Sequence, residues 1–175
     1  KITDLALSTC NETDFLIPDD YRYHVHPKIL QAPPITLTPA QQDYAQGLAY
    51  FKGSGVAKDD VKAVEYFLRA ANAGNAMAQH DLAYMYSVGQ GVEKDEEKAF
   101  EWVKKSAEQG NSIAQDDLGV MYGDGRGVPQ DLVQSYRWIA LSARQGNAQA
   151  INDLEYIKRR MTPEQITEAE KLINK

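Results

Sequence analysis

Two histidines have a spacing that suits metal chemistry. His24 and His26 alternate, so in an extended segment both imidazoles point to one side and supply two of the ligands of a zinc site. No third ligand stands at a matching spacing, and histidines in a polar segment are expected at a surface. The sequence therefore predicts no metal site and no cofactor.

The glycine-rich run at residues 123–127 resembles a phosphate-binding loop only in composition. Phosphate loops follow a strand and open a helix, whereas this run follows an expected helix and is predicted to end it. Cys10 is the single cysteine, so neither an internal disulfide nor a thiolate zinc site is expected. The sequence contains no Ser-x-x-Lys, Gly-x-Ser-x-Gly or His-Glu-x-x-His motif, and no catalytic residue is predicted.

The net charge and the hydropathy of the chain limit the partners and the locations that are expected for it. Nineteen Lys and Arg residues against 25 Asp and Glu residues give a formal charge of −6, which repels a phosphate backbone, so nucleic acid is not an expected partner. No stretch approaches the roughly 20 consecutive apolar residues of a membrane-spanning helix. Lys1 in place of Met suggests that a leader was removed, which favours a periplasmic or secreted protein, with the cytoplasm as the alternative.

A repeat of 36 residues organises the chain. The pattern Gly-x-Gly-Val recurs at residues 53–56, 89–92 and 125–128, each time three residues after a tyrosine. Fixed spacing of this kind is typical of stacked repeat units. The other residues that recur in the same register are Asp59, Asp95 and Asp131; Tyr66, Trp102 and Trp138; and the Gly-Asn pairs at 74–75, 110–111 and 146–147.

Each repeat is predicted to form a helical hairpin. In the middle copy, Leu82 lies in an apolar stripe of helical spacing, and Gly89 is placed to end that first helix. Asp95 has the residue type and position of an N-cap for the second helix, and Asn111 those of an N-cap for the next repeat. Trp102 and its counterpart 36 residues later are expected to be buried between helices.

These motifs, L-G-x-x-Y-x-x-G-x-G-V followed by D, K-A, an aromatic residue and A-x-x-G-N, resemble the Sel-one-like repeat (SLR), a bacterial relative of the tetratricopeptide repeat. The resemblance covers about residues 39–150, with departures at Gln46 and at 134–135. It implies an all-α fold: a right-handed α/α solenoid with repeats at about 39–74, 75–110 and 111–146 and a capping segment at 147–175. Residues 1–38 do not repeat and are predicted to form an extended segment.

The resemblance implies a non-enzymatic module that binds another protein or peptide. In tetratricopeptide relatives the first helices of successive repeats line a concave groove, and the side chains opposite their packing residues contact the ligand. The register transfers that role to ten positions here: Tyr44, Leu48, Phe51, Met77, His80, Tyr84, Ile113, Asp116, Val120 and Tyr156. Most of them are apolar or aromatic, as a binding surface requires.

Several alternatives stay open at this point. The chain's own residues 15–37 are a possible cover for the groove in place of a partner. The resemblance also implies, more narrowly, an immunity protein that neutralises a secreted bacterial toxin, or a partner in the cell envelope. The alternative from a different class is a hydrolase or β-lactam-binding protein, as discussed for cysteine-rich relatives.

Overall fold

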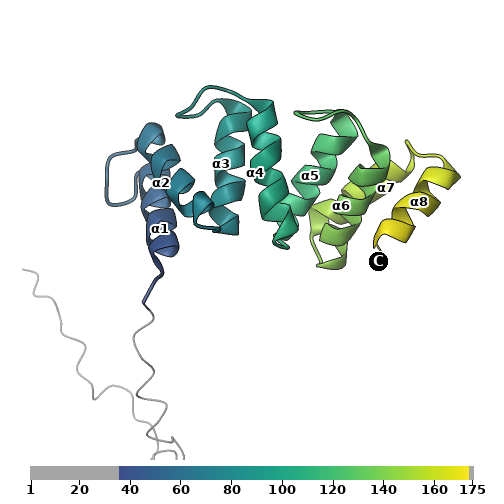
Figure 1. Ribbon diagram of the computed structural model, residues 1–175, viewed down its shortest axis with the longest axis horizontal. Coiled ribbons are helices and arrows are strands. Elements are labelled where there is room, and N and C mark those ends of the chain that lie inside the picture. The colour runs from purple at the N-terminus through teal and green to yellow at the C-terminus, as the bar shows by residue number, and fades with distance from the viewer. Residues whose placement is uncertain (1–35, 174–175) are drawn as a thin grey trace, which may run out of the picture. The chain divides into compact units, whose positions relative to one another are not determined.

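The computed structural model describes residues 36–173, and this part of the chain contains α-helices and no strand, which confirms the all-α prediction (Figure 1). Predictions that concern residues 1–35, including His24, His26 and Cys10, lie outside the described residues. The helices are Pro39–Lys52 (α1), Asp60–Asn72 (α2), Ala76–Val88 (α3), Glu96–Glu108 (α4), Ser112–Asp124 (α5), Leu132–Arg144 (α6), Ala148–Lys158 (α7) and Pro163–Ile173 (α8).

The helices form a solenoid of stacked hairpins. The pairs α1/α2, α3/α4 and α5/α6 follow one another side by side, and α7 and α8 complete the row (Figure 1). Each helix from α1 to α6 packs against the next along the chain, and α8 packs against α6. The predicted solenoid is therefore confirmed.

Capping residues set the helix boundaries in every repeat. In the middle repeat, the Asn75 side chain accepts the Ala78 amide at the start of α3, and Gly89 ends that helix in the left-handed conformation with φ 73°. The Asp95 carboxylate accepts the Lys98 amide at 2.9 Å at the start of α4, as predicted. The equivalent caps of the other repeats and of α7 are Asp59, Asp131, Asn111, Asn147, Gly53 and Gly125.

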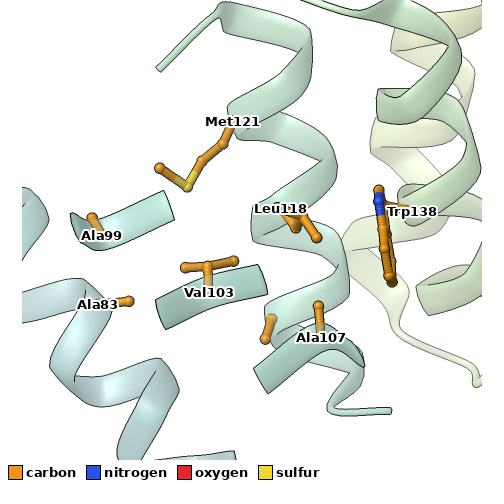
Figure 2. Close-up of a cluster of buried hydrophobic side chains, with 8 residues drawn as sticks. Ala83, Ala99, Val103, Ala107, Leu118, Met121 and Trp138 are labelled. Atoms are coloured by element: carbon orange, nitrogen blue, oxygen red, sulfur yellow. The ribbon is translucent and has the colours of Figure 1, made fainter. Parts of the chain in front are cut away.

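Consecutive hairpins share their apolar core. Figure 2 shows the central cluster, in which Ala83 of α3, Val103 of α4, Leu118 of α5 and Trp138 of α6 meet. Leu118 is fully buried and Trp138 is 8% exposed. Trp102 is only half-buried, with the Lys105 ammonium 4.0 Å from its ring centroid, so the expectation that both tryptophans are buried is wrong for Trp102.

Polar side chains form hydrogen bonds both within the hairpins and between neighbouring ones. The Gln109 amide donates to the Gln79 side chain at 2.6 Å, and the Gln79 amide donates to the Ala71 carbonyl at 3.0 Å. The Ser106 hydroxyl donates to the Ala76 carbonyl at 2.7 Å. These bonds recur 36 residues later through Gln145, Gln115 and Ser142. The bonds from Gln79 and Gln115 to the Ala71 and Ala107 carbonyls cross a repeat boundary and help to fix how one hairpin sits on the next. The other bonds join the two helices of one hairpin.

The second glycine of each loop marks where a hairpin meets the preceding one. A Cβ atom at Gly91 would overlap the Asp60 carbonyl, and one at Gly127 would overlap the Glu96 carbonyl. Both carbonyls lie at the start of the second helix of the preceding repeat. The equivalent Gly55 lies in the first hairpin of the described residues, and a Cβ there would meet nothing within 4 Å.

The C-terminal segment caps the solenoid, as predicted. The Thr162 hydroxyl accepts the Gln165 amide at 3.3 Å, and the Gln165 side chain accepts the Thr162 amide at 2.9 Å, which together form a capping box before α8. Ala169 is fully buried, and Ile166 and Ile173 pack on the same cluster between α6, α7 and α8.

We expect Gly127→Ala to destabilise the protein by about 1–3 kcal/mol more than Gly55→Ala, measured by urea unfolding. Both glycines have positive φ, 67° and 76°, so the backbone strain of an alanine is similar at the two positions. Only Gly127 also has a carbonyl of the preceding hairpin against it. Equal losses for the two variants would show that this contact does not hold the hairpins together.

Candidate functional site

Exposed apolar side chains gather on the first helices of the hairpins. We call the surface of α1, α3, α5 and α7 the first-helix face. Tyr84, Ile113 and Tyr156 on this face are 50%, 50% and 60% exposed, and Met77 is 46% exposed. On the described second helices α2, α4 and α6, by contrast, Val61 is the only large apolar residue that is exposed. Apolar exposure on one face of a repeat array is the surface property expected of a binding site.

The first-helix face contains a cavity at each junction between successive hairpins. The first cavity, about 500 Å³, has Tyr44, Leu48 and Phe51 of α1 on one side and His80 and Tyr84 of α3 on the other. The second, about 310 Å³, lies between α3, α4 and α5, and His80 and Tyr84 line it as well. The third, about 180 Å³, lies between α5, α6 and α7 and is lined by Val120, Asp153, Tyr156 and Ile157, among others.

The structure brings seven of the ten predicted positions together in these cavities. They are Tyr44, Leu48, Phe51, His80, Tyr84, Val120 and Tyr156. Met77 and Ile113 are exposed on the same helices but line none of the three cavities.

Asp116 differs from the expectation. Its side chain is 5% exposed, so it is not presented to a partner as a surface residue. The neighbouring Asp117 lines the second cavity in its place. Sequence spacing did not resolve which of the two adjacent aspartates reaches the surface.

Polar contacts connect the first helices across the junctions. The Tyr44 hydroxyl of α1 donates to Asp81 of α3 at 3.0 Å, and the His80 Nε2 atom of α3 lies 2.7 Å from Asp117 Oδ2 of α5. The two contacts occupy the same repeat positions, and we call them the first and second rungs. His80 Nδ1 also lies 3.6 Å from Asp81. Burial of Tyr44 and its contact with Asp81 raise the pKa of this hydroxyl.

The two carboxylates beside His80 keep its ring protonated at neutral pH. Hydrogen bonds to Asp117 and then to Asp81 raise the His80 pKa to about 9, against the opposing effect of burial. The imidazolium therefore donates to Asp117, which joins α3 to α5, and forms a longer ion pair with Asp81. The second rung is an ion pair in the wall between the first and second cavities.

Aspartates recur along the first-helix face with the period of the repeat. Asp81, Asp117 and Asp153 line the first, second and third cavities. Each of these aspartates directly precedes a leucine that packs inward from its first helix. This recurring Asp-Leu pair could have identified them from the sequence, but the prediction did not use it. The basic residues that line the three cavities are Lys52, Arg126 and Arg160.

The family model of the Sel1 repeat matches residues 38–75, 76–111 and 112–147. The chain belongs to the Sel1 repeat family. Proteins of this family generally mediate protein–protein interactions and are typically non-enzymatic scaffolds. A search of curated proteins gives no match.

Solved structures of Sel1 repeat proteins resemble this one. The Sel1 repeat protein from Oxalobacter formigenes is 34% identical over 66% of this chain and 87% of its own, with a TM-score of 0.63. The protective antigen c5321 of uropathogenic Escherichia coli is 30% identical with a TM-score of 0.63, and the match covers 77% of this chain but 37% of the antigen. Helicobacter pylori cysteine rich protein B is 19% identical over 67% of this chain and 98% of its own, and its TM-score of 0.55 shows a shared fold.

Two further properties concern the described residues as a whole. Within residues 36–173, no group of three His, Cys, Asp or Glu side chains is arranged to hold a metal ion. No helix in this range is long and apolar enough to cross a bilayer.

We expect His80→Gln to destabilise the Sel1 repeat chain by about 1–3 kcal/mol at pH 6 and by much less at pH 10, measured by urea unfolding. The His80 pKa is raised in the folded state, so its contribution is fully present below the unfolded pKa of about 6.5 and is lost as the pH rises through about 9. A stability difference that stays constant from pH 6 to pH 10 would contradict a charged second rung.

Proposed function

We propose that this Sel1 repeat chain binds a segment of another protein along its first-helix face, with side chains of the partner inserted in the junction cavities. The observation that carries the proposal is the row of three cavities, which the 36-residue repeat places side by side on one face. The family generally mediates protein–protein interactions, and the repeat scaffold supplies a rigid surface for that purpose.

Tyr84 is the proposed centre of this interaction. Its side chain is 50% exposed and lines both the first and the second cavity, so a bound segment that fills either cavity contacts it. Tyrosine supplies a large apolar area with little loss of side-chain entropy, and aromatic residues at the centre of an interface carry much of the binding free energy. Leu48 and Phe51 extend the apolar surface on one side, and Val120 and Tyr156 extend it on the other.

The remaining proposed contacts frame the cavities. Met77 and Ile113 lie exposed near the N-terminal ends of α3 and α5 and add apolar area at one edge of the face. Asp117 replaces Asp116 in the proposed binding set, because it lines the second cavity and Asp116 is buried. The Asp117 carboxylate is bound to His80, and the Asp117 side chain is still 49% exposed.

Tyr84→Ala should weaken binding by at least about tenfold while leaving the melting temperature nearly unchanged. The probe is a set of peptides selected from a random-peptide display library on the full chain, and the measurement is the Kd of each peptide. Val61→Ala is the matched control, since Val61 is 57% exposed but lies on the second helix α2.

Three results would count against the proposal. The first is equal binding of the selected peptides to the Tyr84→Ala variant, and the second is equal loss of binding in Val61→Ala. The third is that residues 1–37, supplied as a separate peptide to a chain that begins at Thr38, displace every selected peptide, because the face would then be occupied by the chain itself.

A further inference from the structure

The third junction breaks the pattern of the first two rungs. Tyr44, His80 and Asp116 occupy one position of the 36-residue repeat, and Asp81, Asp117 and Asp153 occupy the next position. In the first two rungs a donor on one helix meets an aspartate on the following first helix, at 3.0 and 2.7 Å. At the third junction both positions are aspartates, Asp116 and Asp153, so two carboxylates stand where the repeat elsewhere has a donor and an acceptor.

Asp116 has no internal partner for its buried oxygen. The residue is 5% exposed, and its Oδ1 atom forms no hydrogen bond within the described structure. A buried carboxylate without a donor is costly to the folded state. Burial, followed by the charges of Asp153 and Asp117, raises the Asp116 pKa to about 6, so this carboxyl is largely ionised at neutral pH.

Cations close to this junction are engaged with other groups. Arg160 lines the third cavity, but its guanidinium donates to the Gly123 carbonyl at 2.9 Å and lies 3.5 Å from Asp124. His80 is held by Asp117 at 2.7 Å. Asp153 accepts from the Gln149 amide, which is neutral, at 3.1 Å. Within residues 36–173, no cation is recorded in contact with Asp116 or Asp153.

We propose that the third junction recognises the basic head of a lysine or arginine side chain in the partner segment, which supplies the donor that Tyr44 and His80 supply in the first two rungs. This inference rests on the proposed function and specifies the chemistry of the partner. The ammonium or guanidinium contacts Asp153, which lines the cavity, and compensates the buried charge of Asp116.

The walls of the third cavity suit the rest of such a side chain. Val120, Ile139 and Ile157 line it, and they provide apolar surface for the methylene stem of a lysine or arginine. The buried Ser135 hydroxyl, which has no hydrogen-bond partner in the described residues, also lines the cavity. A cavity of about 180 Å³ accepts one side chain and not a helix.

The experiment repeats the peptide selection on the full chain and on its Asp153→Asn, Asp116→Asn and Glu101→Gln variants. Glu101 is an exposed carboxylate on α4 and serves as the charge-matched control. We expect peptides that bind the unmodified chain and the Glu101→Gln variant to carry Lys or Arg at one fixed position. Replacing that residue with norleucine should weaken binding to the unmodified chain at least about tenfold, and binding to Asp153→Asn by much less.

The outcomes separate this inference from the proposed function. Peptides that require Tyr84 but carry no fixed basic residue would overturn the inference and leave the proposed function intact. The same holds if norleucine weakens binding equally in the unmodified chain and in both aspartate variants. Failure to obtain any peptide that requires Tyr84 would overturn both. Because the norleucine change is made in the peptide, the comparison on the unmodified chain does not depend on how the variants fold.

Discussion

The apolar face that consecutive hairpins share is the interaction on which the rest of the structure depends. A single hairpin cannot bury its own apolar side chains, and the central cluster accordingly draws Ala83, Val103, Leu118 and Trp138 from four successive helices. The bond from the Gln79 amide to the Ala71 carbonyl, repeated from Gln115 to Ala107, then helps to fix the angle at which one hairpin sits on the next. The same stacking contacts recur from one hairpin junction to the next.

A constant stacking geometry also creates the proposed binding surface. Since each repeat is 36 residues long without insertion, equivalent positions of the first helices line up, and a cavity opens at every junction. Small sequence differences then give each cavity its own chemistry. At the repeat position from which Tyr44 and His80 contact the next first helix, the third junction has Asp116. We infer that the fold places the cavities, and that the residue differences between repeats determine which partner side chain each cavity accepts.

Features that depend on local chemistry could be predicted from the sequence, and features that depend on stacking could not. Asp95 and Gly89 cap their helices as predicted, because capping involves only neighbouring residues. The rungs join positions 37 residues apart, one more than the repeat, so the period alone does not reveal them. Likewise the sequence placed Gly127 in a glycine-rich run predicted to end a helix, but its closeness to the Glu96 carbonyl follows from the way the hairpins stack. The burial of Asp116 has the same origin.

The most direct test of binding on the first-helix face is amide hydrogen exchange of the full chain with and without a selected peptide. Amides of α1, α3, α5 and α7 should exchange more slowly in the complex, with the largest effect around Tyr84, while α2, α4 and α6 change little. Slower exchange concentrated in α2, α4 and α6 would place the partner on the opposite face and contradict the account.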